Sequence, residues 1–220
     1  MIEGVFIVVE GIDGSGSTTV VERLAAHLVS KRRPAHRTCE PSSGPIGSMI
    51  RQILAHRIVI PSEWGAASPG WATMALLFAS DRLDHLEAEV LPRLRDEVIV
   101  VSDRYDLSSL AYQTATAPTD DPEEARRVVA WIRELNVRAR RPDLTLVLDV
   151  RPEVAAERRK NRGGARELYE DGELQARLAE AYTRAEQLAP GDRIVHVDAN
   201  RAVDEVVAAC VASVDQLLGA

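Results

Sequence analysis

The sequence has little cysteine and no long run of apolar residues. Its two cysteines, Cys39 and Cys210, stand far apart and form no CxxC pair, so the pattern indicates neither a disulfide framework nor a zinc cluster. No apolar stretch reaches the roughly 20 residues that cross a bilayer. The N-terminal MIEGVFIVVEG has no basic residues before its apolar part, unlike a signal peptide. We therefore expect a cytoplasmic protein without a membrane segment.

Lysine is also scarce, and the balance of charge is negative. The formal net charge is -7 and the isoelectric point is near 5.3, which argues against a broad basic surface that coats nucleic acid. Lysine occurs only as Lys31 and Lys160. Any phosphate site must therefore be local and rely on arginine, whose planar fork suits phosphate. A solvated surface charge is the alternative interpretation of any single arginine.

Short apolar runs alternate with longer helical patterns along the chain. With 220 residues, 45% of them hydrophobic, we expect one α/β domain over residues 1–220. The runs are typical of parallel strands buried on both faces, with helices covering the sheet on both sides. Expected strands are 5–10, 98–101, 144–150 and 194–197, and expected helices are 18–32, 45–55, 71–94, 123–137, 152–161, 174–189 and 202–218.

Three polar segments interrupt this pattern: residues 61–70, 115–122 and 161–172. The last contains Gly163 and Gly164 with arginines on both sides. Glycines beside cations predict a mobile lid that covers phosphate groups, over about residues 158–172. A solvated surface loop is the alternative. The cations concerned are Arg158, Arg159, Lys160, Arg162 and Arg166.

A glycine-rich loop follows the first expected strand and opens the first expected helix. Its sequence, GIDGSGST at 11–18, matches the phosphate-binding loop G-x-x-x-x-G-K-S/T except that Ser17 replaces lysine. The glycines let backbone N–H groups face phosphate oxygens, and the helix N-terminus adds positive potential. The Thr18 hydroxyl would bind Mg²⁺. The residues expected to bind ATP are Gly11, Gly14, Ser15, Gly16, Ser17, Thr18 and Thr19.

The serine at position 17 raises the question of what replaces the lysine charge. Losing one preorganised contact to a developing charge costs about 3 kcal/mol, roughly a hundredfold in rate. An active enzyme therefore needs another cation, and a tight turn without a ligand is the alternative interpretation of the loop. Asp13, inside the loop, needs a partner other than the triphosphate, such as a sugar hydroxyl.

An acid and an arginine follow the strand 98–101, in the sequence SDRY at 102–105. Ligands of open parallel sheets bind at the carboxyl ends of the strands, so Asp103 and Arg104 should stand beside the phosphate loop. Asp103 would hold Mg²⁺ or its water, and Arg104 would clamp an acceptor phosphate. The alternative is an N-cap aspartate beside a solvated arginine.

Several motifs in order resemble the thymidylate kinase family over nearly the whole chain. They are VVEGIDGSGSTT, EPSSGPIGSMIR after a second strand, LLFASDR, SDRYDLSSLAYQ and PDLTLVLDVRPEVAAERR. The resemblance implies a P-loop three-layer sandwich, in which helices flank a central five-stranded parallel sheet. It also implies a homodimer that transfers a phosphoryl group from ATP to dTMP with Mg²⁺.

The resemblance assigns roles to matching positions. Arg51 and Arg104 would grip the dTMP phosphate, and Asp13 would approach that phosphate or the 3′ hydroxyl. Phe78 would stack on thymine and Arg82 would hydrogen-bond its O4, whereas core packing is the alternative for Phe78. The implied dTMP residues are Asp13, Glu40, Arg51, Phe78, Arg82, Arg104, Ser109, Tyr112 and Gln113, with Tyr112 near the sugar 2′ position.

The chain departs from the family pattern at Ser17, at Leu168 in the lid and at Cys39. Arg158, Arg162 and Arg166 would share one helical face, and we expect Arg162 or Arg166 to replace the lysine. The catalytic residues implied are Asp13, Arg104, Arg162 and Arg166. Two alternatives remain open: a catalytically degenerate nucleotide-binding regulatory protein, and a kinase for another deoxynucleotide or a nucleoside.

Overall fold

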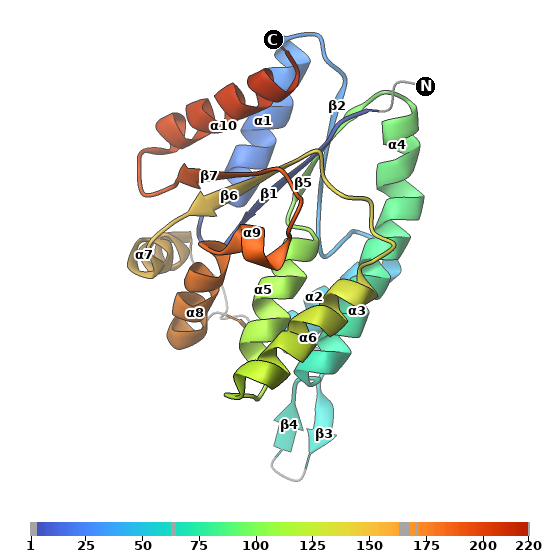
Figure 1. The fold of residues 1–220 in the computed structure, drawn as a ribbon, viewed down its shortest axis with the longest axis vertical. Helices are drawn as coiled ribbons and strands as arrows, with labels where there is room; N and C mark the ends of the chain where they lie inside the picture. The colour runs from blue at the N-terminus through green and yellow to red at the C-terminus, as the bar shows by residue number, and fades with distance from the viewer. Residues whose placement is uncertain (1–3, 63–64, 163–167, 170, 220) are drawn as a thin grey trace.

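Five parallel strands form the central sheet of the computed structural model, which describes residues 4–62, 65–162, 168–169 and 171–219 (Figure 1). The strand order is β2-β5-β1-β6-β7, and every neighbouring pair is parallel. This confirms the predicted α/β fold with a five-stranded sheet. The strands are β1 (Phe6–Gly11), β2 (Ala35–Cys39), β5 (Ile99–Asp103), β6 (Leu144–Asp149) and β7 (Ile194–Asp198).

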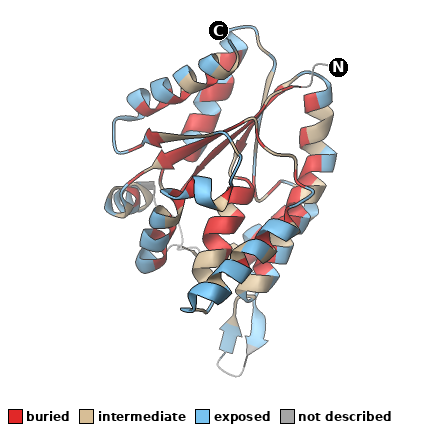
Figure 2. Ribbon diagram, viewed as in Figure 1, coloured by how far each residue is buried: buried red, intermediate tan, exposed pale blue. Residues whose placement is uncertain are grey.

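Helices cover both faces of the sheet, because alternate residues of the central strand β1 point in opposite directions. Ile7 and Val9 belong to the apolar cluster that contains Leu24 of α1 (Ser17–Ser30), and α1 packs against α10 (Val203–Leu217). Phe6 and Val8 instead pack with a long helical segment that consists of α3 (Trp71–His85), the π-helical η1 (Leu86–Val90) and α4 (Leu91–Arg95). Buried positions concentrate on the strands and on the inner helix faces (Figure 2).

The remaining helices gather below the carboxyl ends of the strands, and a small hairpin projects beyond them (Figure 1). Among the described residues, no helix is both long and apolar enough to span a bilayer. The helices are α2 (Pro45–Leu54), α5 (Asp106–Thr116), α6 (Pro122–Leu135), α7 (Pro152–Arg162), α8 (Gly172–Tyr182) and α9 (Ala185–Leu188), and the antiparallel hairpin is β3 (Ile60–Ser62) with β4 (Gly65–Ala67).

Three local expectations need correction. The segment 61–70, expected to be irregular, contributes to the β3–β4 hairpin. The helix expected over 174–189 is two helices, because Thr183 bonds back to the Glu180 carbonyl at 2.7 Å and the chain turns before α9. Helix α5 has no counterpart in the sequence expectations, since its serines weaken the helical pattern, yet Leu107, Leu110 and most of its other residues are buried.

The carboxylate of Glu10 lies fully buried at the end of β1. Its Oε1 accepts hydrogen bonds from the backbone N–H groups of Tyr105 (2.8 Å) and Ser108 (3.1 Å). Its Oε2 accepts from the hydroxyls of Ser108 (2.6 Å) and Tyr182 (2.9 Å). One side chain therefore ties β1 to α5 and to α8. Burial raises the pKa of Glu10 to about 7, and these donors only partly offset that effect.

We expect the Glu10 carboxyl to make the protein less stable as pH rises. Its native pKa lies above its ordinary value of 4.5, so between these values the native state holds a proton that the unfolded chain releases. The free energy of unfolding therefore falls by up to about 3 kcal/mol from pH 4.5 to pH 8 through this group. Glu10→Gln removes the titration. In urea unfolding, the stability gap between wild type and variant should narrow from pH 5 to pH 8, and a constant gap would contradict the assignment.

Candidate active site

The glycine-rich loop connects β1 to α1 in the expected strand–loop–helix arrangement. Gly14 and Gly16 have φ values of 89° and 98°, in the left-handed region that glycine adopts without strain. Gly14 also packs closely against α7, because an added Cβ would lie 2.4 Å from the Ala155 carbonyl oxygen. Only glycine at position 14 lets α7 lie over the loop.

Thr18 and Asp103 meet beside this loop, as the sequence predicts. Asp103 ends β5, and its Oδ2 accepts a hydrogen bond of 2.6 Å from the Thr18 hydroxyl. Its Oδ1 is buried and has no hydrogen-bond partner among the described residues. Within this part of the chain, no three His, Cys, Asp or Glu side chains cluster to hold a metal. A hydroxyl beside a carboxylate fits Mg²⁺ that takes its other ligands from phosphate and water.

Arg104 joins the loop to α5. Its guanidinium binds Asp13 Oδ1 at 2.5 Å, the Gly11 carbonyl at 2.9 Å and the Ser108 hydroxyl at 3.2 Å. Its own backbone has φ 72°, a region that non-glycine residues occupy rarely and often at functional sites. The guanidinium also lies over the Tyr112 ring, 5.2 Å from the centroid. Arg104 is thus an ordered clamp rather than a solvated surface charge.

Two cavities meet at this ion pair. A cavity of 770 Å³ lies over the glycine-rich loop and is lined by Gly14 to Thr19, by Asp103 and by four arginines: Arg104, Arg158, Arg159 and Arg201. The other cavity has an aromatic lining. Asp13 and Arg104 line both. The aromatic cavity is lined by Asp13, Glu40, Pro41, Leu54, Phe78, Arg82, Arg104, Tyr105, Ser108, Ser109, Tyr112, Gln113 and Tyr169.

The aromatic cavity brings together most of the residues that the sequence assigns to dTMP. Arg51 is the exception, because it does not line the cavity and its exposed guanidinium donates to the carbonyl of Pro41 at 2.7 Å. The atoms Tyr112 Oη, Gln113 Oε1 and Arg82 Nε are buried without a hydrogen-bond partner among the described residues. Buried polar atoms of this kind suit a ligand that carries both donors and acceptors, such as a nucleobase.

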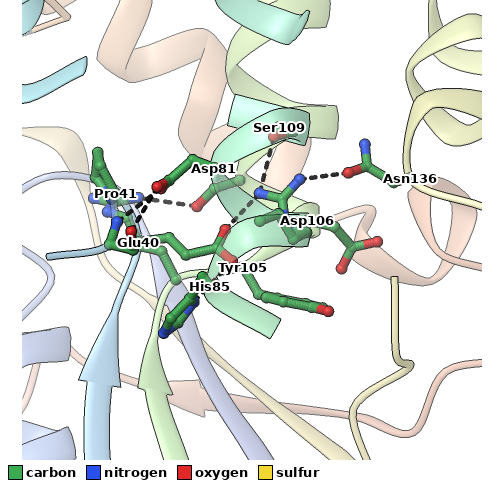
Figure 3. A network of polar contacts seen from close by, with 12 residues as sticks. Glu40, Pro41, Asp81, His85, Tyr105, Asp106, Ser109 and Asn136 are labelled. Carbon is green, nitrogen blue, oxygen red and sulfur yellow. Dashed lines mark hydrogen bonds and ion pairs between the residues drawn. The ribbon is translucent and has the colours of Figure 1, made fainter. Parts of the chain in front are cut away.

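Arg82 is the centre of a buried polar network beneath this cavity. Glu40, Ser109 and Asn136 converge on its guanidinium (Figure 3). The Glu40 carboxylate is 2.6 Å away, and His85 Nδ1 lies 3.4 Å from the other Glu40 oxygen. The arginine predicted to read a base edge is therefore held in place by an ion pair, and its Nε has no hydrogen-bond partner among the described residues.

The segment 168–169 precedes α8, and its Tyr169 lines the aromatic cavity. The Leu168 backbone N–H donates to the Leu54 carbonyl at 3.0 Å, and the Tyr169 ring packs edge-on against Tyr112. Gln175 of α8 donates to the Tyr169 carbonyl at 2.7 Å and to Asp13 Oδ2 at 3.1 Å. Sequence reasoning missed Gln175, because nothing in the sequence indicates that α8 returns to the loop.

Two expected catalytic arginines cannot be placed. Arg166 and the side chain of Arg162 lie outside the described residues, so their assignment stays a prediction. The structure instead brings Arg158 and Arg159 to the loop. Arg158 donates to the Ser15 carbonyl at 3.2 Å, and Arg159 donates to the Asp13 carbonyl. The sequence predicts that Arg158, Arg162 and Arg166, which recur every four residues, share one helical face. Arg159 follows Arg158 directly and does not belong to that face.

The parallel sheet, the glycine-rich loop and the adjoining cavities define a P-loop α/β protein that binds nucleotides. The sequence profile of the thymidylate kinase family matches residues 9–210. A probable thymidylate kinase of Pyrobaculum aerophilum is 38% identical over 208 residues, 92% of each chain. A thymidylate kinase of Bifidobacterium longum is 34% identical over 214 residues, 97% of this chain and 98% of that one. This chain belongs to the thymidylate kinase family.

The buried Arg82–Glu40 pair yields a prediction for stability. Arg82→Ala should lower the free energy of unfolding by about 3 to 5 kcal/mol, because it leaves the Glu40 carboxylate buried without its arginine partner. Arg127→Ala breaks an ion pair with Glu123 whose two side chains are 69% and 63% exposed. That matched control should change stability by less than about 0.5 kcal/mol. Urea unfolding checks both, and similar losses in the two variants would refute the distinction.

Proposed function

We propose that the protein transfers the γ-phosphoryl group of ATP to dTMP with Mg²⁺, giving dTDP and ADP for dTTP synthesis. The observation that carries this proposal is that Asp13 and Arg104 line both cavities. A donor on the glycine-rich loop and an acceptor in the aromatic cavity would meet at this pair. Their reacting groups would then be close enough for direct transfer.

The loop side of the site suits the triphosphate of ATP. The backbone N–H groups of Gly14 and Gly16, together with the N-terminus of α1, would bind phosphate oxygens. The N–H of Ser15 donates to the Ile12 carbonyl at 3.0 Å and so shapes the loop. Thr19 would contact the α-phosphate. Thr18 and Asp103 would hold Mg²⁺, which when bound draws negative charge from the β- and γ-phosphates.

The aromatic side of the site suits a thymidine monophosphate. Phe78 would stack on the base, while the Arg82 Nε and Gln113 Oε1 atoms offer a donor and an acceptor to its edge. Tyr112 would leave little room beside the sugar 2′ carbon, which favours deoxyribose. Glu40 and Ser109 would act through Arg82, which both contact.

Arg104 and Arg51 would neutralise the acceptor phosphate, and Asp13 would orient it or the 3′ hydroxyl. The transfer is an in-line displacement. An oxygen of the dTMP phosphate bonds to the γ-phosphorus while the bond to the β,γ-bridging oxygen breaks, and ADP leaves. Arg104 is placed to balance charge on the acceptor side, since its bond to Asp13 fixes the guanidinium. The covering segment near Tyr169 would limit access of water, which otherwise hydrolyses ATP.

Three further features belong to this proposal. We propose that residues 1–220 act as one domain with a lid over about 158–172, that two copies form a homodimer, and that the protein works in the cytoplasm. The catalytic assignment of Arg162 and Arg166 is part of the same proposal, because lid arginines would lie on the donor side. The homodimer and the lid arginines follow from the resemblance to thymidylate kinases. The single domain follows from the chain length, the lid from the glycines beside cations, and the cytoplasmic location from the scarcity of cysteine and the lack of a long apolar run.

Turnover by the purified protein tests the function. With MgATP, ADP formation should be selective for dTMP over dUMP, dGMP, dCMP and AMP, because Phe78 and Tyr112 shape the acceptor cavity. Equal turnover of several monophosphates would point to a kinase of broader or different specificity. Absence of turnover, with ATP still bound, would instead support a catalytically degenerate nucleotide-binding protein.

Removal of the metal should abolish turnover, and Mg²⁺ should restore it. In Asp103→Asn, the Mg²⁺ concentration for half-maximal rate should rise at least about tenfold, since the carboxylate next to Thr18 is lost. Asp120→Asn is the matched control, because Asp120 is exposed and lines neither cavity. An unchanged Mg²⁺ requirement in Asp103→Asn would remove Asp103 from the metal site.

A further inference from the structure

The glycine-rich loop lacks a cation of its own. In a loop of this type, a lysine at position 17 reaches the β- and γ-phosphates. Ser17, the first residue of α1, cannot supply that charge. Phosphoryl transfer depends on cations that balance the developing charge. The replacement should therefore be found among the arginines that line the phosphate cavity.

Three of the four arginines in this lining are already engaged by a carboxylate or by several carbonyl oxygens. The guanidinium of Arg104 binds Asp13, Gly11 and Ser108 on the acceptor side. Arg158 donates to three carbonyl oxygens, of Ser15 (3.2 Å), Ala199 (2.9 Å) and Arg201 (3.4 Å). Arg201 pairs through Nε with the exposed Asp198 at 3.0 Å. Arg158 thus holds the loop in shape, and Arg201 belongs to an exposed ion pair.

Arg159 differs from these three. Its one hydrogen bond among the described residues goes from Nη1 to the backbone carbonyl of Asp13, and it has no carboxylate partner there. A guanidinium has five N–H donors, so most of them remain for a ligand. Its side chain lines the phosphate cavity, and Asp13 is the residue where the donor and acceptor cavities meet.

The close packing of α7 on the loop explains why Arg159 can reach the triphosphate. A Cβ added to Gly14 would lie 3.1 Å from Arg159 Cγ and 2.4 Å from the Ala155 carbonyl oxygen. The aliphatic part of Arg159 therefore crosses the loop at its middle glycine. A guanidinium that arrives from this side covers the same phosphates that a lysine would approach from α1, and its planar fork can bind two oxygens at once.

We propose that Arg159 replaces the absent lysine of the loop, binding the β- and γ-phosphate oxygens of ATP and stabilising the charge on the transferring group. The transfer step rests on the proposed kinase function, whereas the binding step requires only a polyphosphate in the cavity. The assignment differs from the expectation for Arg162 or Arg166, because it rests on a side chain placed at the loop.

Four variants test the proposal: Arg159→Ala, Ser17→Lys, the double variant with both changes, and Arg177→Ala. Calorimetry gives the Kd for ATP, AMP and inorganic tripolyphosphate, and steady-state assays give kcat with dTMP. Arg159→Ala should weaken ATP and tripolyphosphate at least about tenfold, leave AMP within about threefold, and lower kcat about a hundredfold. Arg177→Ala removes an exposed cation of α8 that lines neither cavity, and should stay within about twofold throughout.

The double variant separates a phosphate contact from a purely structural role. If Arg159 supplies the missing charge, Ser17→Lys should restore Kd and kcat of Arg159→Ala to within about fivefold of wild type. If Arg159 only holds the Asp13 carbonyl, lysine at position 17 would not rescue, and AMP would weaken as much as ATP. Either result overturns the proposal, as does an Arg159→Ala variant within threefold of wild type.

Folding and function are controlled separately. Urea unfolding shows whether Arg159→Ala still folds. Arg159→Lys keeps the charge, so its tripolyphosphate affinity should stay within about tenfold of wild type, and this variant tests the proposal even where Arg159→Ala unfolds. If Arg159→Lys folds but binds tripolyphosphate as weakly as Arg159→Ala does, the proposal is wrong. If wild type fails to phosphorylate dTMP, the kinase function is wrong, yet the tripolyphosphate affinities still decide the role of Arg159.

Discussion

The buried carboxylate of Glu10 is the contact on which the arrangement of the site depends. It stands where β1 ends and the phosphate loop begins, and its hydrogen bonds come from the start of α5 and from Tyr182 of α8. Burying a carboxylate costs free energy unless donors surround it. The observed placement of α5 and α8 supplies those donors. The loop, the helix that carries Ser109 to Gln113 and the helix that carries Gln175 are thereby fixed together.

From that arrangement follows a division of the site into two charge environments. On the acceptor side, Arg104 pairs with Asp13 and lies over the Tyr112 ring, and these contacts fix its guanidinium where an incoming phosphate would bind. On the donor side, the loop has no lysine and the arginines of α7 lie over it. A lysine-poor sequence thus places its phosphate-binding charge on a neighbouring helix, where planar guanidinium groups can also bind loop carbonyls.

Much of the fold could be predicted because its signals are local. The apolar runs at 98–101 and 144–150 have the length and composition of buried parallel strands, and β5 and β6 confirm them. Helix α5 was harder to predict, since Ser108 and Ser109 have weak helix propensity and the helix is stabilised by burial instead. The β3–β4 hairpin is short and lies apart from the main sheet, so its sequence carries little pairing signal.

The sequence by itself determined the chemistry available: a glycine-rich loop with Ser17 in place of lysine, and an acid and an arginine at a strand end that must face that loop in a parallel sheet. Spacing on one helix could not decide which distant arginine meets the loop, because that depends on how closely α7 packs at Gly14. The same holds for Gln175 against Asp13, and for Arg82 held by Glu40 and Asn136. These contacts join residues far apart in the chain, and only the packing of helices on the sheet brings them together.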